Sequence, residues 1–331
     1  MSATSEAMCT PNIERIRKVA DDIGPYVIRT STVPWPVPTA VGGPDMDVFV
    51  KMELFQRTGS FKARGAINVI SHAMRSAADQ QFAGVTAFSA GNHAIATAYA
   101  ARMLGTTAKV VMPRTANTFR RERCEAYGAE IVFGDTISDL IQIVGEIQAD
   151  EHRYLVHPFE GIHTVEGTAT VGMELCDDVP ALDAVVVPVG GGGLIAGIAL
   201  AVKQLQPDCL VIGVEPEGAS GMQQSLHQKR PMEQVNVNTI ADSLGAPMHE
   251  PLSYSFVERY VDEMVCVSDQ QLRDGMRQMF TQMKLAVEPA CAASIAALQG
   301  PLAARLSGKR VALIGCGSNI DPDSYCRLLD T

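Results

Sequence analysis

The chain has 331 residues, of which 47% are hydrophobic and 19% are charged, and its formal net charge is −10. This length can bury one large core or two smaller ones, and the negative charge argues against binding to nucleic acid or anionic lipid. No apolar run reaches the ~18 residues of a membrane-spanning helix, and the first residues lack the features of a signal peptide. We therefore expect a cytoplasmic globular protein whose partner is a small molecule.

From about residue 82 onward, short β-rich runs alternate with helical patterns, which is typical of parallel βαβ units. The first series predicts strands at 85–88, 108–112 and 130–133, helices at 94–104 and 117–127, and a helix that Asp135 caps and that ends near residue 149. The second series predicts strands at 184–189, 210–214 and 310–314 and a helix at 194–205. The expected fold class is α/β, with two parallel sheets and hence two domains.

The most informative motif is an apolar strand that leads through four glycines into a helix. The glycines are Gly190, Gly191, Gly192 and Gly193, and Leu194 begins the helix LIAGIALAVK. Because glycine backbone can turn its N–H groups inward next to a helix N-terminus, this loop suits a dianionic phosphate. A flexible turn and a dinucleotide-binding loop are the alternatives, although GGGGLIAG departs from GxGxxG.

Three further runs contain candidate functional residues. Lys62 lies in TGSFKARGA, although most lysines are simply solvated. Residues 89–93, SAGNH, precede a helix whose free N–H groups could hold a carboxylate, but plain helix capping explains Ser89 and Asn92 equally well. Cys316 follows a buried strand in VALIGCGSNID, where a core cysteine is also possible. No HExxH-type histidine pair indicates a metal site.

Together, and in this order, the four runs resemble the fold-type II pyridoxal 5′-phosphate (PLP) enzymes, most closely the serine/threonine dehydratase and serine racemase branch. The similarity extends over about residues 34–321. It implies a two-domain fold like the tryptophan synthase β-subunit, with parallel-rich twisted sheets flanked by helices. It further implies a large cofactor-binding domain of residues 1–75 and 158–331, a small α/β domain of residues 76–157, and a homodimer.

The resemblance also implies a role for individual residues. Lys62 would carry PLP as a Schiff base, with Phe61 packed beside it. The phosphate would be bound by the N–H groups of the four glycines and Leu194, the ring 3′-oxygen by Asn92, and the pyridine nitrogen by Cys316. Glu288 would lie near the cofactor, although a Glu-Pro pair that starts a helix would look the same. The substrate would contact Ser89, Ala90, Gly91, Asn92 and His93.

The expected reaction is the conversion of a 3-hydroxy amino acid, by default L-threonine or L-serine, to a 2-oxo acid and ammonia. A neutral thiol cannot hold a proton on the ring nitrogen as an aspartate would, which favours elimination. Racemases of this branch have a serine where this chain has Ala90, so racemisation is disfavoured. No metal is expected near Glu215, because Gly221 stands where relatives place a ligand side chain.

Alternative substrates remain open at this stage. Phe159 stands at a position where serine racemases have a different residue, and Ser243 at a position where other relatives have a different residue. Both differences could change the choice of substrate. Dehydratases of 3-hydroxyaspartate or phenylserine, a serine racemase, and a catalytically silent PLP-fold binding protein are therefore further hypotheses.

Overall fold

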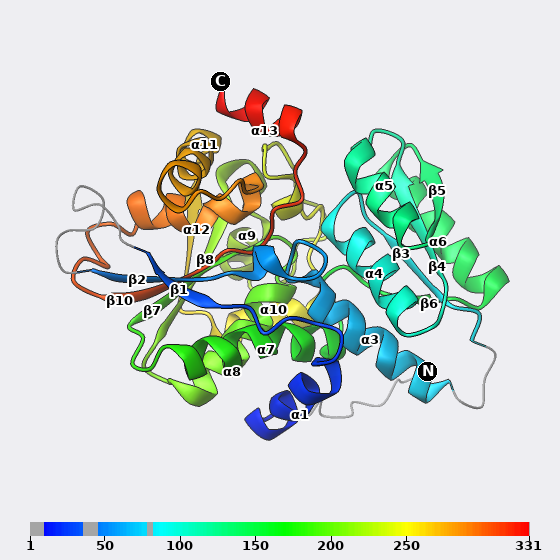
Figure 1. Ribbon diagram of the computed structural model, residues 1–331, viewed down its shortest axis with the longest axis horizontal. Coiled ribbons are helices and arrows are strands. Elements are labelled where there is room, and N and C mark those ends of the chain that lie inside the picture. The colour runs from blue at the N-terminus through cyan, green and yellow to red at the C-terminus, as the bar shows by residue number, and fades with distance from the viewer. Residues whose placement is uncertain (1–9, 36–45, 78–81, 331) are drawn as a thin grey trace.

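A computed structural model describes residues 10–35, 46–77 and 82–330 of the chain, and Figure 1 shows how they are arranged. Two sheets form the centres of two lobes, one around residues 85–155 and the other around the remaining strands. Residues 1–9, to which the expectation about a signal peptide refers, lie outside the described residues. Among the described ranges, no helix is long and apolar enough to cross a membrane.

The larger sheet has six strands in the order β1-β2-β10-β7-β8-β9. Only β1 and β2 are antiparallel, and the other neighbours are parallel. The central strands β7 and, after Arg310, β10 consist of buried apolar residues, because both faces of the sheet are covered by helices. The strand bounds are β1 (Thr32–Trp35), β2 (Asp47–Lys51), β7 (Ala184–Pro188), β8 (Leu210–Pro216), β9 (Glu263–Val267) and β10 (Arg310–Ile314).

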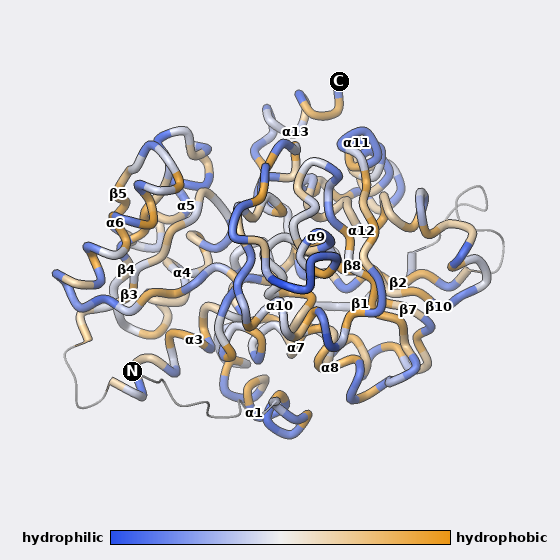
Figure 2. Tube along the Cα trace, turned by 180° about the vertical axis from the view of Figure 1, so that it is seen from behind, coloured by the Kyte–Doolittle hydropathy of each residue, from blue (hydrophilic) through white to orange (hydrophobic). Residues whose placement is uncertain are grey.

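Helices α7 and α8 cover one face of this sheet, and α11 and α12 cover the other (Figure 1). Figure 2 shows hydrophobic colour on β7 and β8 and mostly hydrophilic colour on α11, which lies at the surface. The helices of this lobe are α1 (Ile13–Ile23), α3 (Lys62–Ser76), α7 (Ile162–Asp178), α8 (Gly193–Leu205), α9 (Gly221–Gln228), α10 (Pro251–Tyr260), α11 (Asp269–Gln278), α12 (Pro289–Gln299) and α13 (Pro322–Leu329). Its short turns are η1 (Glu53–Phe55), η2 (Glu217–Ala219), η3 (Asp242–Leu244) and the π-helical η4 (Met279–Met283).

The smaller sheet has four parallel strands in the order β5-β4-β3-β6. We call it, with its helices, the four-stranded unit, and the rest of the described chain the six-stranded unit. Its strands are β3 (Val85–Phe88), β4 (Ala108–Pro113), β5 (Glu130–Gly134) and β6 (Tyr154–Leu155), and its helices are α4 (Asn92–Met103), α5 (Thr118–Ala126) and α6 (Ile137–Glu151). We propose that the two units correspond to the two domains predicted above, with boundaries near residues 75/76 and 157/158.

The α/β class and the parallel-rich sheets predicted from the sequence are confirmed, and the strands predicted at 85–88 and 310–314 match residue for residue. One detail was wrong, because Asp135 does not cap α6. Thr136 is the N-cap: its hydroxyl accepts the N–H of Asp139, and the Asp139 carboxylate accepts the N–H of Thr136. This reciprocal capping box satisfies two backbone N–H groups, those of Thr136 and Asp139. A cap by Asp135 alone would not satisfy both.

Candidate active site

The glycine loop joins the end of β7 to the start of α8. Two of its positions require glycine. A Cβ atom added at Gly191 would lie only 2.2 Å from the Phe159 ring, and Gly192 has a φ of +97°, which side chains rarely allow. No side chain within the described chain caps α8, so its first N–H groups are left for another acceptor. The geometry required of these glycines and the free helix N-terminus suit a bound phosphate.

Lys62 is the first residue of α3, directly after a loop that Gly59 turns with a φ of +75°. Ser60 forms an isolated antiparallel bridge with Gly317, so the loop before Lys62 is held against the segment that follows β10. The Lys62 amine donates a hydrogen bond of 2.5 Å to the Pro158 carbonyl. Three segments that are distant in sequence therefore meet around this amine.

One cavity unites the residues that were predicted to hold the cofactor. Phe159, Ser243 and Leu244 complete part of its wall. The predicted residues that line it are Phe61, Lys62, Asn92, Gly190, Gly191, Gly192, Gly193, Leu194, Glu288 and Cys316. The glycine loop, the lysine, the cysteine and the glutamate thus face one space, as a ligand site requires.

The remaining predicted substrate residues lie beside this cavity rather than in its wall. Ser89 accepts a hydrogen bond of 3.1 Å from the Gly91 N–H, and Gly91 is the N-cap of α4 without a side-chain cap. His93 is buried, and its Nε2 donates to the Val156 carbonyl at 2.8 Å, because a carbonyl can only accept. Ser89 therefore stabilises the local turn, while the N-terminus of α4 keeps free N–H donors for a carboxylate.

Asn92 does not cap a helix but is the centre of a polar cluster, which we call the Asn92 cluster. Its amide nitrogen donates to Glu288 Oε1 at 2.7 Å, and its oxygen accepts a bond of 2.6 Å from Asn319. Ser243 lies 3.4 Å from the same amide nitrogen. The Asn92 side chain is therefore held in one orientation by residues 151 to 227 positions away.

Burial shifts the protonation equilibria of the groups that face the cavity. It lowers the pKa of Lys62 to about 8, although Cys316 and Glu288 act in the opposite direction. It raises the pKa of Glu288 to about 7, which nearby Arg120 partly offsets. A hydrogen bond with Cys291, together with burial, raises the pKa of Cys316 well above its usual value. The cysteine is therefore a neutral thiol, whereas the lysine can be deprotonated near neutral pH.

Two histidines close to Lys62 are uncharged for the same reason. Burial, reinforced by the Lys62 charge, lowers the pKa of His93 to about 3 and that of His157 to about 4. His157 Nδ1 accepts the N–H of Glu160 at 3.0 Å, which leaves the ring proton on Nε2. Neither ring adds positive charge next to the lysine.

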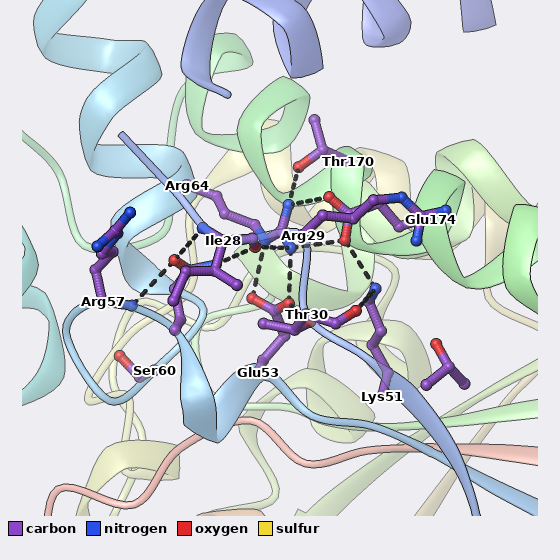
Figure 3. A network of polar contacts seen from close by, with 12 residues as sticks. Ile28, Arg29, Thr30, Lys51, Glu53, Arg57, Ser60, Arg64, Thr170 and Glu174 are labelled. Atoms are coloured by element: carbon purple, nitrogen blue, oxygen red, sulfur yellow. Dashed lines mark hydrogen bonds and ion pairs between the residues drawn. The ribbon is translucent and has the colours of Figure 1, made fainter. Parts of the chain in front are cut away.

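A buried ionic network fixes the helix that begins with Lys62 (Figure 3). Arg64, two residues further along α3, pairs with Glu53 at 2.8 Å and with Glu174 at 2.7 Å. Lys51 pairs with the other oxygen of Glu174 at 2.7 Å and donates to the Thr30 carbonyl. Two cations and two anions are thus buried together with their hydrogen bonds satisfied, so α3 is joined to β2, η1 and α7.

The comparison with known proteins agrees with this geometry. The model of the family described as pyridoxal-phosphate dependent enzyme matches residues 23–317. The chain belongs to this family of PLP-dependent enzymes. It is 50% identical over 286 residues to the phenylserine dehydratase of Ralstonia pickettii, which covers 86% of this chain and 87% of that protein.

Other relatives cover nearly the whole chain. The L-threonine ammonia-lyase of Thermotoga maritima is 35% identical over 96% of this chain and 78% of its own length. The structure of maize serine racemase aligns with a TM-score of 0.85 at 32% identity, over 96% of this chain and 98% of that one. The predicted branch of the PLP-dependent enzymes is therefore confirmed.

The residues of the cavity fit PLP, the cofactor of this family. The glycine loop and the uncapped N-terminus of α8 could bind the phosphate group of PLP, and the Lys62 amine could bond to its aldehyde group. One oxygen of a lining residue, Glu288 Oε2, is buried without a hydrogen-bond partner among the described residues. A buried polar atom of this kind beside a cavity is consistent with a polar ligand.

The region around Glu215, where no metal was expected, is held by hydrogen bonds within the chain. The buried Glu215 carboxylate accepts the N–H groups of Met222 and Gln223, both at 2.8 Å, at the start of α9. His249 lies against Gly221, where a Cβ atom would be 2.4 Å from its Nε2. Within the part of the chain that the structure describes, no group of three or more His, Cys, Asp or Glu is placed to hold a metal ion.

Sequence reasoning missed three parts of the site. The Pro158 carbonyl, the Asn319 side chain and the Arg120 guanidinium all lie at the cavity or the Asn92 cluster. Asn319 lies in the same GCGSNID run as Cys316, so the sequence contained a signal that Asn319 belongs to the site. Arg120 lies in a basic run on α5 that resembles an ordinary solvated helix face, and only the tertiary structure reveals its contacts.

Proposed function

We propose that this PLP-dependent enzyme is a dehydratase that converts a 3-hydroxy amino acid to a 2-oxo acid and ammonia. The observation that carries the proposal is the position of the Lys62 amine in one cavity with the glycine loop and the neutral Cys316. The names of the relatives, phenylserine dehydratase and L-threonine ammonia-lyase, support the same reaction class. When bound, PLP supplies an electron sink that is conjugated to the amino group of the substrate.

Lys62 is the proposed base. Because burial lowers its pKa to about 8, its amine can take the α-proton at neutral to mildly alkaline pH. As the Cα–H electrons form the new double bond, the β-hydroxyl leaves and takes up one proton, so that in net terms the α-proton and the hydroxyl are lost together as one molecule of water and the Lys62 amine is restored. The released enamine tautomerises and takes up one water molecule, which yields the 2-oxo acid and ammonia. Water is lost and regained, so the net reaction is a deamination.

Two residues favour elimination over racemisation. Cys316 is a neutral thiol, so it cannot stabilise a protonated pyridine nitrogen as a carboxylate would. Ala90 has no exchangeable proton on its side chain, so this position offers no second acid. We therefore propose the elimination reaction and not a serine racemase.

The substrate that we propose first is a 3-hydroxy amino acid with an aryl substituent, such as 3-phenylserine. The higher of the two sequence identities to curated relatives given above, 50%, is to a phenylserine dehydratase. In addition, Phe159 in the cavity wall packs edge to face against His157, with 4.7 Å between the ring centroids, and His157 packs in turn against Phe88 at 5.8 Å. L-Threonine and L-serine form the second candidate class, which the ammonia-lyase relative supports.

The test is a panel of 3-hydroxy amino acids supplied to the purified enzyme: phenylserine, threonine, serine and 3-hydroxyaspartate. Release of 2-oxo acid and ammonia is measured together with the D-isomer of each substrate. We expect phenylpyruvate from phenylserine at the highest kcat/KM, and no product from Lys62→Ala. Faster formation of D-serine than of pyruvate would refute the elimination proposal, and a colourless wild-type protein that does not take up PLP would refute the assigned site.

The homodimer and the cytoplasmic location remain predictions, as do the individual residue roles given above. The absence of a metal requirement is also a prediction.

A further inference from the structure

Arg120 crosses the boundary between the two units. It lies on α5 of the four-stranded unit and is only 7% exposed. Its guanidinium binds both carboxylate oxygens of Asp242 on η3, and its Nε donates to the Asn319 carbonyl at 3.0 Å. A single buried cation is therefore bound by two segments of the six-stranded unit.

The same guanidinium supports the loop that precedes Asn92. A Cβ atom at Gly91 would lie 3.1 Å from an Arg120 terminal nitrogen and 3.4 Å from its central carbon. Gly91 therefore rests directly on the guanidinium, without a side chain between them. Moving Arg120 would move the backbone from which the Asn92 side chain projects.

Arg120 also faces the unsatisfied oxygen of the Asn92 cluster. Glu288 Oε1 accepts from Asn92, while Oε2 is buried without a hydrogen-bond partner in the described part of the chain. The nearest cation to this oxygen is Arg120, at 4.0 Å. Ser243, the residue after Asp242, is 3.4 Å from Asn92. Each residue that orients Asn92 is thus in contact with Arg120 or next to a residue that is.

We propose that Arg120 is a positioning residue that couples the approach of the two units to the orientation of Asn92 and Glu288 at the cofactor cavity. When the units are together, the pair with Asp242 fixes Ser243, and the bond to the Asn319 carbonyl fixes the residue that orients Asn92. When the units separate, all of these contacts are lost together. A well-formed cofactor cavity is in this way linked to the closed arrangement.

An ordinary salt bridge between the units would stabilise the protein without affecting the cavity. Asn117, also on the four-stranded unit, provides the comparison, because it donates to Asp321 across the same boundary at 2.7 Å, and its side chain forms no hydrogen bond with the Asn92 cluster among the described residues. Its oxygen also caps α5. Asn117→Ser keeps an N-cap side chain, but the shorter side chain loses the hydrogen bond across the boundary.

The experiment measures PLP affinity and the absorption band of bound PLP in Arg120→Met, Arg120→Lys, Asp242→Asn and Asn117→Ser. Thermal unfolding of each cofactor-free protein is recorded as well. We expect Arg120→Met and Asp242→Asn to weaken PLP binding by about tenfold and to shift the band, and Arg120→Lys to restore part of the affinity. Asn117→Ser should stay within about twofold of wild type, whatever its unfolding temperature.

Wild-type affinity and an unshifted band in both Arg120→Met and Asp242→Asn would overturn the proposal, and so would an equal loss in Asn117→Ser. Asp242 is more than half exposed, so Asp242→Asn tests the coupling even if Arg120→Met does not fold. These readouts need no substrate. A failure here is thus distinct from a failure of the dehydratase assignment.

Discussion

At the scale of single residues, the chemistry depends on one amine. Lys62 lies on the first turn of its helix, half-buried, and its amine contacts the Pro158 carbonyl. In water a lysine is almost fully charged at neutral pH, with a pKa of about 10.4. Removal from water penalises the charged form, and this lowers the pKa of Lys62 to about 8.

This lowered pKa predicts how fast Lys62 reacts in the cofactor-free protein. Because only the neutral amine is nucleophilic, trace acetylation of Lys62 with acetic anhydride should rise with pH through a midpoint near 8. A lysine peptide labelled in the same tube should show a midpoint about two pH units higher. Peptide mass spectrometry measures both, and equal midpoints would show that the amine is solvated.

At the scale of elements, α7 and α8 approach each other closely through small residues. A Cβ atom at Gly197 would lie 2.2 Å from Thr168 Oγ1 and 2.5 Å from the backbone nitrogen of Ala169. At Gly172 it would lie 2.8 Å from the Ile198 carbonyl. This contact sets the position of α8, whose first turn is the proposed phosphate site.

Gly197→Ala should therefore destabilise the protein. The added methyl group meets backbone as well as a side chain, so the helices must separate, at a cost of about 1–3 kcal/mol. PLP affinity should fall as well, because α8 carries the glycine loop. Chemical denaturation and PLP titration are the measurements.

Gly145→Ala in α6 is the matched control, since a Cβ atom there would meet no heavy atom within 4 Å. It should stabilise its helix by about 0.5–1 kcal/mol, because alanine restricts the unfolded chain more than glycine does. Equal effects of the two substitutions would contradict the close packing of α7 and α8.

At the scale of the whole molecule, the cavity draws its walls from both units and from segments between residues 61 and 316. A ligand that binds only when these segments are assembled stabilises the folded state by an amount that rises with the logarithm of its concentration. Arg120 adds to this linkage, because it ties the two units together next to Asn92.

Removal of PLP should therefore lower the unfolding temperature. At free PLP of 100 times its Kd, the cofactor should add about 2.7 kcal/mol to the free energy of unfolding. Differential scanning fluorimetry of the cofactor-free protein across a PLP series checks this. Lys62→Ala should retain part of the stabilisation through the phosphate site, and an unfolding temperature independent of PLP would contradict the assigned cavity.

The sequence by itself determined the features that depend on neighbouring residues. The run of Val185 to Val187, the four glycines and the apolar helix after them specify a strand, a phosphate loop and a helix through local pattern and backbone freedom. The order of the motifs was sufficient for the resemblance that identified Lys62. Even in these local features, the cap of α6 was assigned to Asp135 instead of Thr136, because adjacent polar residues both suit an N-cap.

Only the tertiary structure decided which groups meet and how they are charged. Asn92 and Glu288 are 196 residues apart, and Arg120 and Asp242 are 122 apart, so no local pattern relates them. Their encounter depends on how two sheets are assembled, and the pKa values of Lys62 and Glu288 depend on the burial that this assembly produces. The sequence therefore specified the chemical groups, and the packing of the two units set their orientation and protonation.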